Sequence, residues 1–185
     1  MTGSARASGK QAEAGATARQ LTDAAATREL GRRLARVLRA GDLVILTGDL
    51  GAGKTTLTQG IGEGLGVRGR VASPTFIIAR EHAPTGDGPG LIHVDAYRLA
   101  SIAEVDALDL DSSMAESVTV VEWGAGLVEG LAQDRLEIDL VRPRGVEGAG
   151  VELGQAAAAD QPRRVVLRPV GARWNGVELP GAVVG

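Results

Sequence analysis

Residues 48–55, Gly-Asp-Leu-Gly-Ala-Gly-Lys-Thr, constrain the fold more than any other stretch of the chain. They follow an apolar run at 43–46 and precede a helix-compatible stretch at 55–65. Glycines allow successive backbone N–H groups to turn inward around an anion, and the N-terminus of a following helix favours negative charge. The stretch matches the pattern G-x-x-x-x-G-K-[ST] between a strand and a helix, which is typical of a phosphate-binding loop.

Two side chains of this loop have a specific chemistry. Lys54 can reach the β- and γ-phosphates of a nucleotide, and the Thr55 hydroxyl can ligate a phosphate-bound Mg²⁺. A glycine-rich turn that arose by chance is the alternative, because the chain contains 27 Gly. All four specified positions match, however, in the expected strand and helix context. We therefore predict a binding site for a nucleoside triphosphate.

Composition limits the remaining possibilities. A chain of 185 residues can form one domain with a substantial core. The net charge of −3 argues against a broad basic surface, so we expect contact with RNA to be indirect at most. Zero Cys excludes disulfides and is compatible with a reducing cytosol. Because no apolar run reaches about 18 residues and the N-terminus lacks an apolar segment, we expect no membrane contact and a cytoplasmic protein.

The apolar pattern divides the chain into a leader, a domain and a tail. Residues 1–20 lack periodicity and predict a disordered leader, and 21–170 form the domain. Within it, Pro, Gly and Ala at 142–162 predict a mobile insertion. The tail at 171–185 is either a small closing turn or a frayed end.

Helical spacing after the N-cap signal Thr22-Asp23 predicts a helix at 24–39. Strands are expected at 43–47, 76–80, 91–94, 118–121, 135–141 and 165–167. Unbroken apolar runs are typical of strands covered on both faces. We therefore predict an α/β, P-loop NTPase-like fold of three layers, with a mixed, mainly parallel central sheet and helices on both faces.

Two carboxylates follow apolar strands. Asp95 ends the strand at 91–94, and Glu122 ends the strand at 118–121. Open α/β sheets bind ligands at the carboxyl ends of their strands, and Mg²⁺ requires oxygen ligands. The spacing alone leaves open which acid meets the metal, and a solvated glutamate is the alternative for Glu122. Thr75, beside Pro74, is either a site residue or a solvated loop threonine.

Four motifs together resemble one bacterial family. They are GDLGAGKTT at 48–56, SPTF at 73–76, HVDAYRL at 93–99 and EW at 122–123. Their order and spacing over about residues 20–170 are similar to those of the TsaE (YjeE) ATPases of tRNA threonylcarbamoyladenosine biosynthesis. The chain departs from the family at Ala96, where Leu is usual, and in the long segment at 142–162.

The resemblance implies a small P-loop ATPase that binds ATP and Mg²⁺ and hydrolyses ATP slowly. It also implies two partner proteins, TsaB- and TsaD-like, which carry out the transfer of threonylcarbamoyl to adenosine 37 of ANN-decoding tRNAs. The implied catalytic residues are Lys54, Asp95, Glu122 and Thr75, with Thr55 and Glu122 as metal ligands. The implied nucleotide contacts are Thr27, Gly51, Ala52, Gly53, Lys54, Thr55, Thr56, Trp123 and Arg164.

Two other functions fit the phosphate-binding loop. A small-molecule kinase would use the same loop but usually needs a lid with several arginines, and Arg98 is the only Arg beside the site motifs. A nucleotide-gated binding module would use ATP to change its affinity for partners, with incidental hydrolysis. Thr27 has an equally simple alternative, since its helix could serve only to cover the sheet.

Overall fold

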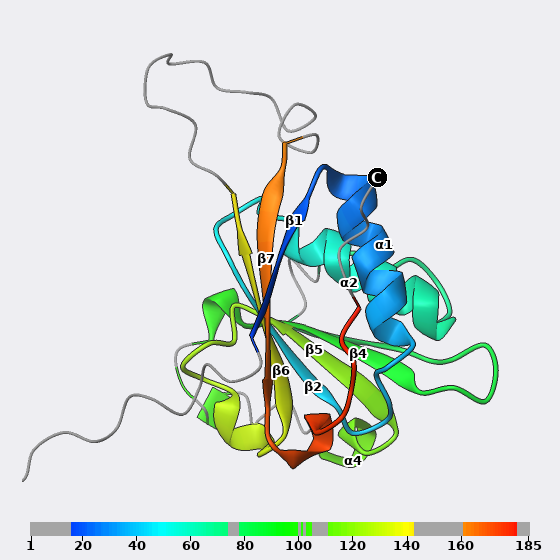
Figure 1. Ribbon diagram of the computed structural model, residues 1–185. Coiled ribbons are helices and arrows are strands. Elements are labelled where there is room, and N and C mark those ends of the chain that lie inside the picture. The colour runs from blue at the N-terminus through cyan, green and yellow to red at the C-terminus, as the bar shows by residue number, and fades with distance from the viewer. Residues whose placement is uncertain are drawn as a thin grey trace, which may run out of the picture.

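A computed structural model describes residues 16–73, 78–99, 101, 103–104, 111–142 and 161–180. The strands in it are β1 Thr17–Leu21, β2 Leu43–Thr47, β3 Ala79–His82, β4 Gly90–Asp95, β5 Ser117–Glu122, β6 Arg135–Val141 and β7 Arg163–Val170. The helices are α1 Ala24–Ala35, α2 Lys54–Leu65 and α4 Asp111–Met114, with 3-10 turns η1 Ala96–Arg98, η2 Glu129–Leu131 and η3 Ala172–Trp174. All seven strands join one sheet in the order β1-β7-β6-β2-β5-β4-β3 (Figure 1).

The sheet is mixed and mainly parallel, as the sequence predicts. Strand β2 lies between β5 and β6 and is parallel to both, and β4 is parallel to β5. Strands β3 and β7 run antiparallel to their neighbours, and β1 is antiparallel to β7. Five of the seven strands therefore share one direction, and the carboxyl ends of β2, β4 and β5 meet at one edge of the sheet.

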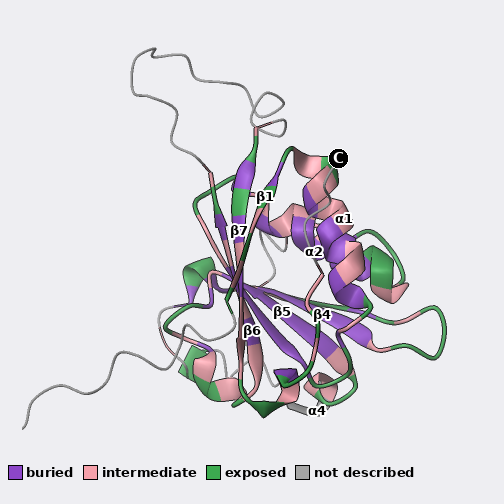
Figure 2. Cartoon of the chain, viewed as in Figure 1, coloured by how far each residue is buried: buried purple, intermediate pink, exposed green. Residues whose placement is uncertain are grey.

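The two faces of the sheet carry separate apolar clusters. Val44 and Leu46 of β2 belong to the cluster that α1 and α2 cover, whereas Leu43 and Ile45 belong to the opposite cluster. On that opposite face the described cover consists of short turns and the partly buried Met114 of α4. Figure 2 shows the central strands as the most continuously buried part of the molecule. The predicted three-layer fold is confirmed.

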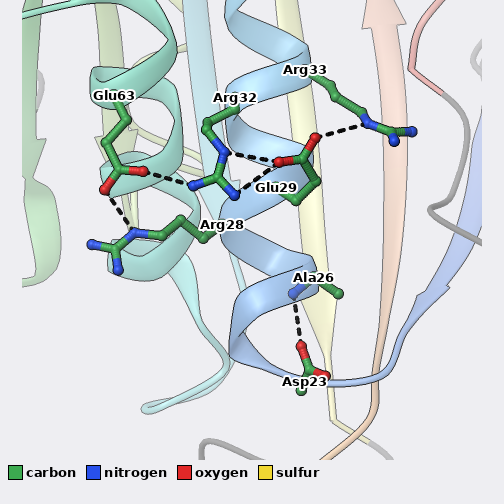
Figure 3. Close-up of polar contacts among 7 residues, drawn as sticks. All are labelled: Asp23, Ala26, Arg28, Glu29, Arg32, Arg33 and Glu63. Atoms are coloured by element: carbon green, nitrogen blue, oxygen red, sulfur yellow. Dashed lines mark hydrogen bonds and ion pairs between the residues drawn. The ribbon is translucent and has the colours of Figure 1, made fainter. Parts of the chain in front are cut away.

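Helices α1 and α2 cross with their backbones in close approach. A Cβ atom added at Gly31 would lie far inside normal contact distance of the Leu57 carbonyl oxygen, and one at Gly60 would overlap the Arg28 carbonyl oxygen. Ion pairs also link the helices, with Glu63 contacting Arg28 at 2.9 Å and Arg32 at 2.8 Å (Figure 3). These pairs are half exposed and contribute little. The glycines therefore set the geometry of the crossing.

We expect Gly60→Ala to destabilise the protein. Alanine in a helix interior is normally favoured over glycine by about 1 kcal/mol. Here the new methyl group would meet the backbone of α1, and such overpacking typically costs about 1–3 kcal/mol. The substitution should therefore lower the free energy of unfolding instead of raising it. Urea unfolding measures the change. Gly86→Ala is the control, because a Cβ there meets nothing within 4 Å. A Gly60→Ala protein as stable as the parent would show that the helices can separate without cost.

Helix α1 begins where the sequence predicts and ends earlier. The Asp23 side chain accepts a hydrogen bond of 2.7 Å from the Ala26 N–H, and this bond lowers the pKa of Asp23 (Figure 3). The helix ends at Ala35 rather than Arg39, because the next N–H groups bond three residues back, as in the 3-10 turns that commonly close helices. Leu38 remains buried beyond the helix end.

The predicted leader is wrong at its C-terminal boundary. Residues 17–21 form β1, which pairs with β7 at the edge of the sheet. The local sequence holds one strongly apolar residue, Leu21, so the strand depends on its partner rather than on its own pattern. Residues 1–15 and most of the predicted insertion, 143–160, lie outside the described residues.

The start of the tail is a closing turn rather than a frayed end. Trp174 in η3 is 6% exposed and belongs to the main cluster, with Val177 and Leu179 packed against it. A bilayer-spanning helix is absent from the described ranges, where every helix is too short or too polar for one.

Candidate functional site

The loop between β2 and α2 has the conformation that its glycines predict. Gly48, Gly51 and Gly53 have φ values of 145°, 72° and 106°. Gly53 caps α2 in the left-handed region, and a Cβ atom there would lie 2.7 Å from a guanidinium nitrogen of Arg163. Only glycine fits this position. The first turn of α2 therefore opens directly into the loop, where its free N–H groups favour an anion.

Lys54 lies inside this loop with little contact to water. It is 4% exposed, and its Nζ donates hydrogen bonds to the carbonyl oxygens of Gly48 at 2.8 Å and Asp49 at 3.1 Å. The same atom lies 3.7 Å from the centre of the Trp123 ring. Burial lowers the pKa of Lys54, and the negative charges of Glu122 and Asp95 partly oppose this shift. The loop thus holds a poorly solvated cation at its centre.

Thr55 meets Glu122 at the mouth of the loop. The Thr55 hydroxyl donates to the Glu122 carboxylate at 2.9 Å, and Glu122 is 3% exposed at the end of β5. Asp95 is the register partner of Glu122 on β4, but its carboxylate accepts from the Tyr97 N–H at 3.1 Å and from Ser73 at 3.4 Å. Of the two predicted acids, Glu122 is therefore the one placed against Thr55.

A histidine to which the sequence motifs assign no role lies behind Glu122. His93 Nε2 lies 2.8 Å from a carboxylate oxygen of Glu122, and the His93 side chain is fully buried. The available signal was its spacing: His93 precedes Asp95 by two residues, so both lie on the same face of β4.

The structure brings two arginines to the loop that the sequence did not single out. Arg163 and Arg142 both line the pocket at the loop, the first beside Gly53 and the second beside Gly51. Arg164 is exposed on the other side of β7 and lines a separate hollow, so the prediction placed on it is corrected to Arg163. Adjacent residues of a strand point to opposite faces of the sheet, so a shift of one position moves the side chain to the other face.

The other predicted contacts differ in their placement. Thr27 is buried behind Gly53 and donates its hydroxyl hydrogen to the Asp23 carbonyl oxygen at 2.9 Å, so it supports the loop and does not line the pocket. Trp123 lines the pocket, has a φ of 63° and packs against Tyr97 with ring centres 5.2 Å apart. Thr75 lies outside the described residues.

These groups enclose a pocket of about 520 Å³, within the usual range for small-molecule sites. Its lining combines residues 50, 51 and 53–56 with five charged side chains. The cations are Lys54 on α2, Arg163 on β7 and Arg142 just beyond β6, and the acids are Asp95 and Glu122. In the described part of the chain, no group of three or more His, Asp or Glu residues could hold a metal alone. The pocket can therefore accept a polyanion, and a cation there would need ligands from that polyanion.

Comparison with known proteins identifies the family. The family model described as threonylcarbamoyl adenosine biosynthesis protein TsaE matches residues 21–147. The chain belongs to the TsaE family. The TsaE protein of Streptomyces coelicolor is 57% identical over 148 residues, which cover 80% of this chain and 93% of the relative. The TsaE protein of Bacillus subtilis is 36% identical over 150 residues, covering 80% and 83%.

A solved structure agrees with this TsaE assignment. The crystal structure of Bacillus subtilis YdiB superposes with a TM-score of 0.63 at 31% sequence identity. The alignment covers 87% of this chain and 90% of that protein, so the fold extends over nearly the whole length of both. The resemblance stated from the four motifs is confirmed, and the P-loop NTPase-like fold with it.

Proposed function

We propose that this TsaE-family protein binds ATP with Mg²⁺ and hydrolyses it slowly. The observation that carries the proposal is the contact between Thr55 and Glu122 at the mouth of the phosphate-binding loop. In P-loop NTPases, a phosphate-bound metal is held by a hydroxyl from the loop helix and a carboxylate from a neighbouring strand end. Lys54 and the loop amides lie next to this pair and supply the complementary positive charge.

The residues present fit the metal and the nucleotide. Both oxygen donors belong to the class that Mg²⁺ prefers, and Mg²⁺ usually takes only one or two protein ligands beside phosphates and water. When bound, Mg²⁺ would neutralise charge on the β- and γ-phosphates. The chain's own part is to orient the phosphates with Lys54 and the loop, and to place Asp95 beside the attacking water.

The family points to a role in forming threonylcarbamoyladenosine on tRNA, since both relatives are named tRNA threonylcarbamoyladenosine biosynthesis proteins. We place this chain in that process as the ATPase component, acting in the cytoplasm with TsaB- and TsaD-like partners. The net charge of −3 supports indirect rather than direct contact with tRNA. The transfer to adenosine 37 would then be the work of the partners.

A partner-dependent rate is expected from the chemistry. Phosphoryl transfer depends on positioning and charge stabilisation, and one missing group can reduce the rate by ~10³–10⁵-fold. We expect the purified protein to hydrolyse ATP slowly. The two partners together should raise its rate by at least ~10-fold and by no more than the ~10⁵-fold upper end of that range. Steady-state phosphate release with and without the partners measures this. Equal rates would contradict activation, and no ATP binding by calorimetry would contradict the whole proposal.

A small-molecule kinase remains the second candidate, because the structure brings Arg142 and Arg163 to the pocket. Arg98, the only arginine beside the site motifs in the sequence, is exposed, whereas Arg142 and Arg163 line the pocket. The same two cations can equally hold the phosphates of ATP. Incubation with γ-labelled ATP and a metabolite extract separates the functions, since the ATPase yields inorganic phosphate without a labelled acceptor.

A further inference from the structure

The buried pair of His93 and Glu122 adds a residue to the proposed site. His93 lies on β4 and Glu122 on the adjacent strand β5, and their side chains are 0% and 4% exposed. The carboxylate is held from two sides, by His93 at 2.8 Å and by Thr55 at 2.9 Å. Both contacts use Oε1, and the Thr55 hydroxyl also lies 3.3 Å from Oε2. The two neighbours therefore fix the direction in which the carboxylate points.

The hydrogen bond assigns the proton on the imidazole. An ionised carboxylate only accepts hydrogen bonds, so His93 Nε2 must carry the hydrogen and donate it. His93 Nδ1 is buried without a partner among the described residues, so the contact with Glu122 is the side-chain hydrogen bond that the structure shows for this ring. His93 thus acts toward Glu122 as a fixed donor.

The position of Lys54 explains why Glu122 needs a hydrogen-bond donor such as His93 to fix its direction. The negative charge of Glu122 attracts the Lys54 ammonium and opposes the effect of burial on the lysine pKa. If the Glu122 carboxylate could rotate freely, its electrostatic energy would fall as it turned toward Lys54. The resulting ion pair would neutralise the positive charge that is needed to bind phosphates. His93 holds Glu122 from the adjacent strand β4, while the Thr55 hydroxyl connects Glu122 to the loop helix.

We propose that His93 is a positioning residue that keeps the Glu122 carboxylate directed at the Mg²⁺ position beside Thr55. The proposal rests on the proposed function, since it needs Mg·ATP at this site. Groups that orient a metal ligand typically change metal affinity by 10–100-fold when removed. His93 does not touch the nucleotide in this scheme, so nucleotide binding without metal should not depend on it.

The test compares three variants with the parent protein. His93→Leu removes the donor at similar volume, His93→Asn keeps a polar group too short to reach Glu122, and His93→Gln places an N–H near the original Nε2. Each is loaded with a non-hydrolysable ATP analogue and titrated with Mg²⁺, with the Trp123 fluorescence as the signal. Analogue affinity in EDTA is measured by calorimetry. His82→Gln is the matched control, because His82 is also buried but its ring contacts the Arg68 carbonyl oxygen at 3.2 Å rather than Glu122.

We expect His93→Asn and His93→Leu to raise the Mg²⁺ concentration at half-saturation by about 10–100-fold, and His93→Gln to stay within about 3-fold of the parent. Analogue affinity in EDTA should change less than about 2-fold in all of them. The positioning role would be overturned if the Mg²⁺ concentration at half-saturation were unchanged in His93→Asn. It would also be overturned if that concentration rose as much in His93→Gln as in His93→Asn. If His93→Leu does not fold, the Asn and Gln variants still decide the question. A parent protein that fails to bind the analogue would instead contradict the proposed function.

Discussion

Glu122→Gln is expected to slow ATP hydrolysis by a large factor while leaving the nucleotide bound. The substitution keeps the size of the side chain and removes the charge that faces Thr55 at 2.9 Å. Loss of one preorganised electrostatic group in a closed site typically costs on the order of 10²–10³-fold in rate. Phosphate release under saturating ATP measures the loss. Affinity for ATP in EDTA should stay within about 3-fold, because Lys54 and the loop amides remain.

Asp95→Asn is the matched control for this prediction. Asp95 occupies the same row of the sheet on the neighbouring strand, but its carboxylate contacts Ser73 and the Tyr97 N–H rather than Thr55. We expect hydrolysis to fall, with Mg²⁺ affinity less affected than in Glu122→Gln. If Asp95→Asn weakens Mg²⁺ binding more than Glu122→Gln does, the assignment of the metal ligand must be exchanged between the two acids.

Lys54→Met is expected to remove most of the ATP affinity and also to stabilise the free protein. Hydrogen bonds to charged groups contribute about 1.5–3 kcal/mol each, so losing the ammonium should weaken binding on the order of 100-fold. Isothermal calorimetry measures this change. Methionine has a similar length, and it needs no solvation in a position that is 4% exposed. The melting temperature of the nucleotide-free variant should therefore equal or exceed that of the parent.

The lowered pKa of Lys54 sets the pH dependence of this stabilisation. Burial is its main cause, so below the folded-state pKa the native protein holds a charge that water would solvate better. Between the folded-state pKa and the ordinary lysine pKa of 10.5, the unfolded chain binds the proton and the native protein does not, so the stability of the parent protein rises with pH. The stability of Lys54→Met relative to the parent protein should therefore decrease as pH rises toward 10. An advantage that grows with pH, or unchanged ATP affinity, would contradict this account of Lys54.

The loop and the strand ends could be predicted from sequence because their signals are local. The conformation of residues 48–55 depends on glycines and a following helix, and the acid positions depend only on where apolar strands stop. Parallel strands then bring those ends together without further information. Thr55, Asp95 and Glu122 were accordingly predicted at one edge, and the structure places them there.

The remaining contacts depend on which strands are neighbours, which spacing does not reveal. His93 meets Glu122 only because β4 lies beside β5, and Arg163 reaches Gly53 only because β7 pairs with β6 in a particular register. The prediction for Arg164 was wrong by one residue for this reason. Strand β1 was missed for the same reason: it forms because its backbone pairs with β7, although its local sequence is polar.

Gly31 and Gly60 leave α1 and α2 in contact along their main chains, so the two helices can turn or slide only together. The N-terminal turn of α1 also carries Thr27 against Gly53, at the point where the loop enters α2. One wall of the pocket is therefore a rigid block of two helices and the loop. If the proposed nucleotide exchange is reported to a partner, we expect the change on the facing wall, where Trp123 and the exposed Tyr97 pack with their ring planes tilted by 60° just beyond the ends of β5 and β4.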